Sequence, residues 1–225
     1  MGNRSGILVR LGVDGKHRPS FPGRKRNRRV TVLARSERVL GLTGRSRNIF
    51  KLILKTIRLK REAMRANRDP EGYARSLGVR LGTNVTLLGI RPGTFSTEPW
   101  LITIGDNVWI TSGCQFITHD GGTLIFRREV PDLELTAPIT IGNDVMIGRD
   151  VTILPGVNIG SRVIIGAGSV VAKDIPDNSV AAGNPARVIK TADEYLESAK
   201  KRSLHLGHLS GPEKVAALKR HFNVE

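Results

Sequence analysis

The sequence predicts a mainly β protein whose core is a parallel β-helix, with helical segments before and after it. Three observations support this fold class. Aliphatic residues recur every six positions in the second half of the 225-residue chain, 25 glycines accompany an aromatic content of only 4%, and the Lys and Arg residues are concentrated at one end. A six-residue repeat does not fit the 3.6-residue period of an α-helix.

The repeat is clearest between residues 141 and 171. Aliphatic residues stand six positions apart at Ile141, Ile147, Ile153, Ile159, Ile165 and Val171. Small or β-branched residues follow four positions after the first five, at Val145, Val151, Val157, Val163 and Ser169. In hexapeptide repeats each hexad forms a short strand and a corner, three hexads form a triangular coil, and stacked coils bury an aliphatic column. Glycine follows the aliphatic residue in four hexads, where a residue without Cβ helps the chain turn.

A second run, Ile104, Ile110 and Phe116, precedes the first, with a weaker trace at 81–87. Ile104 and Ile141 lie 37 positions apart, one more than a multiple of six, so a segment must be inserted between the two runs. We place this loop at residues 118–136. A loop that leaves a regular solenoid is a usual place for a functional site.

The charge divides the chain further. Residues 1–70 hold 20 of the 36 Lys and Arg residues and 4 of the 20 acids, so they carry the whole formal net charge of +16. We expect a basic, mostly disordered arm at 1–47, an amphipathic basic helix at 48–72, the β-helix domain at 73–190, and helices at 191–225.

The basic segments suggest a polyanionic partner. No aromatic residues interleave the basic run, so nucleic acid is not favoured. The helix can lie on a membrane surface, or its apolar face can pack on the main domain or a neighbouring subunit. Two interpretations stay open: a peripheral membrane contact through residues 1–68, or a solvated basic arm with the helix packed on protein.

The compartment is suggested by two absences. The single cysteine, Cys114, cannot form an internal disulfide, and its inward position in a hexad predicts a buried, inert thiol. Residues 1–20 lack the apolar run of a secretory signal. We expect a cytoplasmic protein, located at the inner face of the membrane where the helix binds lipid.

His119 is the candidate for chemistry. It is the only histidine between Ser20 and Leu204, and it stands where the regular coil breaks, before Asp120 and two glycines. Imidazole, with an ordinary pKa of about 6.5, suits a general base that removes a hydroxyl proton near neutral pH. The alternative is a structural histidine. His205 and His208 have no third ligand nearby in the sequence, so we expect no metal site.

Four segments, residues 73–79, 96–102, 116–122 and 181–189, resemble the hexapeptide-repeat acyltransferases, and in particular the saccharide, capsular-polysaccharide and xenobiotic O-acetyltransferases. The resemblance covers about half of the chain, residues 73–190. It implies a left-handed β-helix, a homotrimer with active sites between neighbouring subunits, and acetyl-CoA as the acyl donor.

The resemblance also implies roles for individual residues. His119 takes the position of the catalytic histidine, which deprotonates the acceptor hydroxyl for direct attack on the thioester without an acyl-enzyme. Glu98 and Asp120 are candidates for orienting His119 or binding a sugar hydroxyl, and Trp100 either stacks on a sugar or packs beneath the loop. The candidates for donor binding are Arg149, Gly166, Ala167, Lys173 and Lys190. Many relatives have a small or polar residue in place of Arg149.

The expected function is therefore an acetyl-CoA-dependent O-acetyltransferase that acts on a hydroxyl of a saccharide or glycan. A metalloenzyme of the γ-carbonic anhydrase type shares the β-helix but needs three zinc-binding histidines, and the repeat region has one. A noncatalytic trimeric scaffold, whose basic arm binds a membrane or nucleic acid, is the other alternative. A His119→Ala substitution would leave its function intact.

Overall fold

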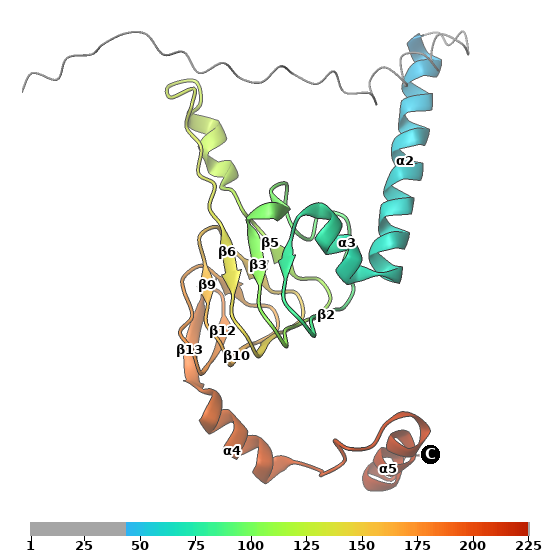
Figure 1. Ribbon diagram of the computed structural model, residues 1–225, viewed down its shortest axis with the longest axis vertical. Coiled ribbons are helices and arrows are strands. Elements are labelled where there is room, and N and C mark those ends of the chain that lie inside the picture. The colour runs from blue at the N-terminus through green and yellow to red at the C-terminus, as the bar shows by residue number, and fades with distance from the viewer. Residues whose placement is uncertain (1–43, 225) are drawn as a thin grey trace, which may run out of the picture. The chain divides into compact units, whose positions relative to one another are not determined.

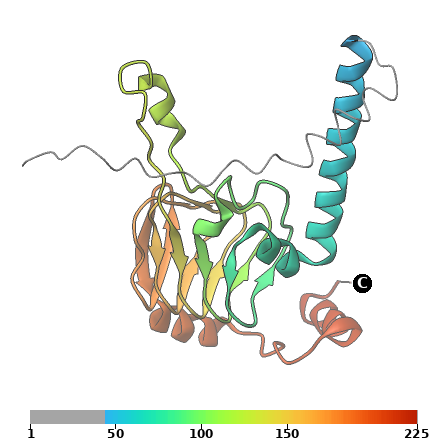
Figure 2. The same cartoon turned by 45° about the horizontal axis from the view of Figure 1, so that its top comes forward.

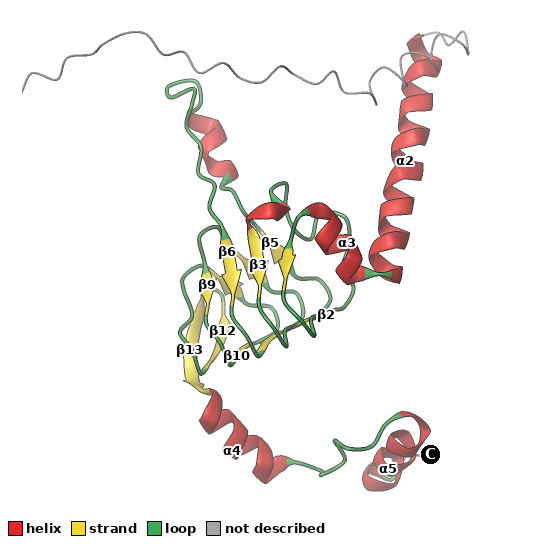
Figure 3. Cartoon of the chain, in the orientation of Figure 1, coloured by secondary structure: helices red, strands yellow, loops and turns green. Residues whose placement is uncertain are grey.

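The computed structural model describes residues 44–224, so most of the basic arm expected at 1–47 lies outside the described residues. Strands of two to six residues alternate with tight corners and wind into stacked coils (Figures 1 and 3). Strands of successive coils lie side by side in Figure 2 and form three sheets. The left-handed parallel β-helix expected from the sequence is confirmed.

Each sheet is built from strands of successive coils. The first sheet contains β1 (Arg80–Leu81), β3 (Ile102–Ile104), β6 (Ile139–Ile141) and β9 (Asn158–Ile159), in that order. The second sheet contains β13 (Ala186–Thr191), β12 (Ser179–Gly183), β10 (Val163–Ile165), β7 (Val145–Ile147), β4 (Trp109–Ile110) and β2 (Thr86–Leu87). The third sheet contains β11 (Val170–Val171), β8 (Thr152–Ile153) and β5 (Gln115–Phe116). All pairs are parallel except β12 with β13, which form an antiparallel hairpin.

The register between coils shows where residues are inserted. In the regular part Ile141 pairs with Ile159, 18 positions later. Ile104 pairs with Ile141, 37 positions later, so this coil holds 19 extra residues. The preceding coil is also long, because Leu81 pairs with Ile104, 23 positions later.

The core is the aliphatic column that the hexads predict. Within each short strand, side chains alternate between the inside of the coil and the solvent. Ile102 and Ile104 are buried and Thr103 points outward, and the pattern repeats one coil later in β6. Burying one such isoleucine contributes about 1.5–3 kcal/mol. Phe95 and Phe116 add a buried ring pair with centroids 5.3 Å apart.

The corner between the first and second sheets shows why glycine is needed in the hexads. A Cβ added to Gly142 would lie 2.6 Å from Ser161 Oγ and 2.8 Å from the carbonyl carbon of Gly160, so glycine is needed because the next coil is close. The left-handed backbone conformation falls instead on Asn107 and Asp144, each with φ 56°. Asn107 Nδ2 donates to Asp144 Oδ1 at 3.1 Å, which links the two coils through their corners.

Helices precede and follow the β-helix. They are α2 (Gly44–Arg68), α3 (Pro70–Leu77), α4 (Ala192–Arg202) and α5 (Gly211–Phe222). Asp69 caps α3 by accepting a hydrogen bond from Gly72 N, and Tyr73 and Ala74 of α3 belong to the buried core. The core is therefore covered where the coils begin. No helix within residues 44–224 is long and apolar enough to cross a membrane.

Replacing Gly142 by alanine should destabilise the β-helix, because the added methyl group overlaps the next coil. Overpacking of this kind costs about 1–3 kcal/mol, which thermal unfolding would record as a lower Tm. Gly121→Ala is the matched control, because nothing lies within 4 Å of the Cβ position there. Equal Tm values for Gly142→Ala and the wild type would contradict the close stacking.

Candidate functional site

Most of the candidate residues lie at two corners of the coil. We call the passage from the third sheet to the first the histidine corner; it comprises residues 96–101, 117–138, 154–157 and 172–174. We call the passage from the second sheet to the third the Arg149 corner; it comprises residues 88–93, 111–114, 148–151 and 166–169. The third sheet separates the two corners within one chain.

His119 lies in the neck of the long insertion. Ala137 N donates to Thr118 O at 2.9 Å, and Asp120 N donates to Leu135 O at 2.8 Å, so the outgoing and returning strands pair on both sides of His119. His119 itself forms an antiparallel bridge with Thr136. The backbone that carries the imidazole is therefore held by hydrogen bonds.

Asp120 acts on the loop rather than on the imidazole. Its carboxylate accepts a hydrogen bond from Gly122 N at 2.8 Å and caps the 3₁₀ helix η2 (Gly121–Phe126). Its backbone carbonyl accepts a hydrogen bond from Thr123 Oγ1 at 3.0 Å. Asp120 therefore fixes the start of the insertion beyond His119.

Glu98 contacts the imidazole directly. It precedes the 3₁₀ helix η1 (Pro99–Leu101), and its Oε2 lies 2.9 Å from His119 Nδ1. Thr97 Oγ1 donates to Glu98 Oε1 at 2.6 Å, and Thr118 Oγ1 donates to Oε2 at 2.7 Å. The hydrogen bonds from Thr97, Thr118 and His119, in that order of importance, lower the pKa of Glu98 to about 2. Glu98 is therefore ionised at neutral pH.

This contact assigns the tautomer of His119. An ionised carboxylate only accepts hydrogen bonds, so the imidazole must donate from Nδ1. Nε2 is then left with a free lone pair that can accept a proton. With 37% of its side chain exposed, His119 is fixed by the protein yet accessible to a substrate.

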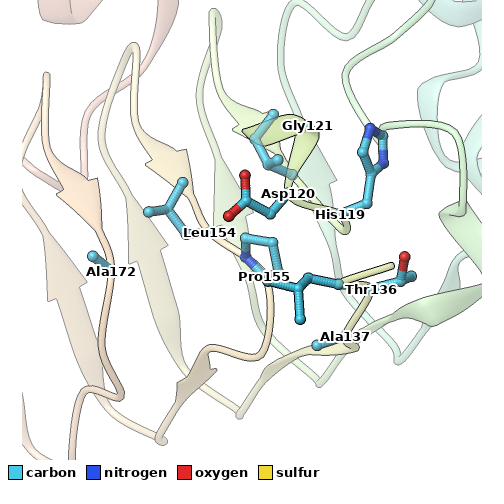
Figure 4. Close-up of a pocket in the computed structure, with 10 residues that line it drawn as sticks. His119, Asp120, Gly121, Thr136, Ala137, Leu154, Pro155 and Ala172 are labelled. Carbon is cyan, nitrogen blue, oxygen red and sulfur yellow. The ribbon is translucent and has the colours of Figure 1, made fainter. Parts of the chain in front are cut away.

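Two cavities meet at His119. The larger, of about 540 Å³, follows the edge of successive coils (Figure 4). Ile117, Leu154 and Ala172 each follow an inward residue of the third sheet and line it along this edge. The complete lining is Ile117, His119, Asp120, Gly121, Leu135, Thr136, Ala137, Leu154, Pro155 and Ala172. The walls away from His119 are largely apolar.

The smaller cavity, of about 250 Å³, lies toward the insertion and is more polar. Besides His119, its lining includes three carboxylates, those of Glu98, Asp120 and Glu134. Arg127 also lines it and forms an ion pair with Glu134. The cavity thus offers several hydrogen-bond acceptors close to the imidazole.

The remaining candidates are distributed over the β-helix. Trp100 is 55% exposed and belongs to the lining of neither cavity. Lys173 is exposed at the histidine corner, beside Ala172. Lys190 lies in β13, opposite Val180.

Arg149, Gly166 and Ala167 lie at the Arg149 corner. Arg149 O accepts a hydrogen bond from Gly168 N at 2.7 Å, so these residues are stacked on neighbouring coils. The Arg149 and Ala167 side chains are exposed. A single chain therefore gathers Arg149, Gly166 and Ala167 at one corner and His119 at another.

The hydrogen bonds from Thr97 and Thr118 to Glu98 were not predicted from the sequence. A sequence signal was present, because each threonine immediately precedes one member of the Glu98–His119 pair. Ile117, Leu154 and Ala172 were not predicted either, although each follows an inward hexad position by one residue. Cys114 is buried, its Sγ donates to Gly148 O at 3.2 Å, and burial raises the pKa of its thiol.

Metal ligands are not gathered in this part of the molecule. Among residues 44–224, no three His, Cys, Asp or Glu side chains are grouped so that they could hold a metal ion.

Comparison with known proteins identifies relatives of the β-helix. Residues 138–173 match the family model described as bacterial transferase hexapeptide, six repeats. The chain is 45% identical over 125 residues to protein CapG of Staphylococcus aureus, which covers 56% of this chain and 73% of CapG. It is 48% identical over 93 residues to a putative acetyltransferase of Saccharomyces cerevisiae, covering 41% of this chain and 47% of that protein. A putative acetyltransferase of S. aureus strain COL is 42% identical over 120 residues, with 44% and 59% covered.

Solved structures also match. One is a hexapeptide-repeat acetyltransferase of Vibrio cholerae complexed with acetyl coenzyme A, with a TM-score of 0.45 and 28% identity over 60% of this chain and 85% of that chain. Another is a maltose O-acetyltransferase of Clostridium difficile, with a TM-score of 0.41 and 28% identity over 62% and 87%.

The Glu98→Gln variant should be less stable than the wild type at neutral pH, and the difference should shrink in acid. Because the pKa of Glu98 is lowered to about 2, against about 4.3 in an unfolded chain, its ionised form stabilises the fold above about pH 5 and this stabilisation is lost toward pH 2. Urea unfolding at several pH values measures the difference.

The control is Glu129→Gln, at an exposed glutamate whose side chain makes no hydrogen bond within the described residues. Its effect on stability should be small at every pH. A Glu98→Gln difference that stays constant from about pH 7 to about pH 3 would contradict the hydrogen-bonded, ionised carboxylate.

Proposed function

The chain belongs to the hexapeptide-repeat acetyltransferases, and we propose that it transfers an acetyl group from acetyl-CoA to a hydroxyl of a saccharide or glycan, with His119 as the general base. The observation that carries the proposal is the hydrogen bond between Glu98 and His119 Nδ1 at the junction of two unlike cavities. The bond leaves Nε2 free, and the cavities give a donor and an acceptor separate approaches to it.

The larger cavity suits the acyl donor. Binding sites for small molecules are concave and mostly apolar, with few polar groups that fix orientation. The line of Ile117, Leu154 and Ala172 offers an extended apolar edge for the pantetheine arm of acetyl-CoA. Lys173, next along the chain from Ala172, is a cation beside this path.

The smaller cavity suits a polyhydroxylated acceptor. Carboxylates accept hydrogen bonds from hydroxyl groups, and those of Asp120 and Glu134 line this cavity beside His119. Its single guanidinium, that of Arg127, is already paired with Glu134. These charges favour a neutral saccharide over an acceptor that carries its own negative charge near the reacting hydroxyl.

The reaction follows from this arrangement. His119 Nε2 takes the proton of the acceptor hydroxyl as its oxygen attacks the thioester carbonyl carbon. The tetrahedral intermediate collapses, the carbon–sulfur bond breaks, and the CoA sulfur receives the proton from the imidazolium. The products are the acetyl ester and CoA-SH. Glu98 stays ionised throughout, holds the tautomer and stabilises the imidazolium.

The expected homotrimer would bring the two kinds of corner together across the boundary between subunits. The third sheet joins the histidine corner to the Arg149 corner in each chain. A threefold arrangement with this sheet turned toward the axis sets the histidine corner of each copy beside the Arg149 corner of the next. In such an assembly Arg149, Gly166 and Ala167 of one subunit would complete the donor site at His119 of its neighbour.

The His119→Ala variant should lose acetyl transfer by about 10²–10⁴-fold, because it lacks the proton acceptor, while acetyl-CoA still binds. Calorimetric titration of acetyl-CoA measures binding without a choice of acceptor, and thiol release in a screen of saccharides measures transfer. His208→Ala, a histidine of the C-terminal segment, is the control and should leave both unchanged. A His119→Ala variant that transfers acetyl groups at the wild-type rate would exclude the base.

Two inactive variants should restore activity when they form mixed oligomers. His119→Ala removes the base, and Ala167→Trp blocks the Arg149 corner with an indole. A mixed trimer contains junctions where an intact His119 meets an intact Ala167 of the next chain, so co-expressed chains purified through two different tags should regain part of the activity.

The control for this experiment pairs His119→Ala with a chain carrying both substitutions, which leaves no intact His119. Light scattering should give three times the 24.6 kDa chain mass for each preparation. Inactive mixed trimers, or a monomer that is fully active, would contradict the shared site.

A further inference from the structure

Helix α2 carries a set of exposed apolar side chains. Between 45% and 71% of each of these residues is exposed. They are Ile49, Leu52, Ile53, Ile57, Leu59 and Met64, which we call the α2 apolar face. At 100° per residue these positions fall on one side of the helix. An exposed apolar surface of this extent indicates a contact with something other than water.

The other side of α2 is basic. It carries Lys51, Lys55, Arg58, Arg61 and Arg65, with a single acid, Glu62. Glu62 accepts a hydrogen bond from Arg58 at 2.8 Å, so one of the positive charges is compensated. Residues 1–47 add thirteen Lys and Arg residues and two acids to the same end of the sequence.

We propose that α2 is a docking surface for an anionic lipid bilayer. The helix lies in the plane of the headgroups, the α2 apolar face enters the boundary with the acyl chains, and the basic side chains contact lipid phosphates. An amphipathic helix rich in Lys and Arg binds an anionic membrane through these two contributions together. This surface is independent of the chemistry at His119.

Lys60 argues against a bundle of α2 helices from several copies of the chain. Its position on the helical wheel falls within the α2 apolar face, between Ile49 and Ile53. A helix bundle would bury the ammonium group, and the one acid of α2 is already paired with Arg58. At a membrane, by contrast, the flexible lysine chain extends to the headgroups while its methylene groups stay among apolar neighbours. The like charges of adjacent helices would also repel one another.

The α2 apolar face equally argues against nucleic acid as the main partner. Binding to phosphates alone requires only the cations and leaves the six exposed side chains of the α2 apolar face without a function. A lipid surface uses both sides of the helix.

The test is co-sedimentation of the 225-residue chain with phosphatidylcholine vesicles that either lack or contain phosphatidylglycerol. We expect binding only to the anionic vesicles. Arg61→Gln/Arg65→Gln should lower the partition coefficient about 30-fold, at about fivefold per charge. Ile57→Gln/Met64→Gln, which keeps all charges, should lower it by at least about tenfold. Glutamine preserves the helix propensity.

The matched controls change the same properties on other helices. Lys201→Gln/Lys214→Gln removes two charges, and Val215→Gln/Phe222→Gln removes two exposed apolar side chains from α5. Both should bind within about twofold of the wild type, since neither changes the α2 surface. Circular dichroism and acetyl-CoA binding identify any variant that misfolds.

Three outcomes would overturn the proposal. The first is a wild type found only in the supernatant with anionic vesicles. The second is a charge variant that loses binding while Ile57→Gln/Met64→Gln keeps it, which would indicate a polyelectrolyte partner such as nucleic acid. The third is a changed oligomer mass of Ile57→Gln/Met64→Gln in light scattering, which would indicate that a second copy covers the face.

Discussion

Each inward side chain of the β-helix must lie above the inward side chain of the preceding coil, and the other features of the fold depend on this constraint. Ile141 over Ile159 and Val145 over Val163 show the 18-residue repeat that satisfies it. One extra residue within a strand would turn every later side chain of that strand to the opposite face. Extra residues are therefore tolerated only at corners, where a coil can lengthen without losing its register.

The candidate site lies where two adjacent coils both contain extra residues at the same corner. One lengthened coil carries Glu98 and the next carries His119, so two insertions that are separate in sequence meet in space. The regular strands on either side anchor both insertions, and backbone pairing in the neck leaves the imidazole little freedom. Such a rigid scaffold under irregular loops suits the proposed site, in which the regular coils form the donor path and the insertion forms the acceptor pocket.

The sequence allowed the aliphatic column to be predicted because its period follows from local geometry, and the phase break between Ile104 and Ile141 located the insertion. The hydrogen bond from His119 to Glu98 could not be derived in this way, since the two residues lie 21 positions apart and meet only after two irregular loops fold. The role of glycine at the corners was predicted only in part. Glycine was expected to help the chain turn. Instead, Gly142 leaves room for the next coil, and Asp144 adopts the left-handed backbone conformation. The position of Arg149 within its hexad would also have been enough to predict that it lies at a different corner from His119.

Electrostatics constrain how a donor can lie in the proposed site. Glu98 is ionised, and the pocket beside it contains two further carboxylates, so this end of the site suits an imidazolium and repels phosphate. In the proposed complex the phosphates of acetyl-CoA therefore lie away from His119, toward a cation such as Lys173. The apolar edge between these ends crosses successive coils, so the spacing of the stacked coils, about 4.8 Å each, sets the distance between the phosphate end and the reacting thioester. The same stacking that buries the core thus determines which length of donor brings its carbonyl to His119.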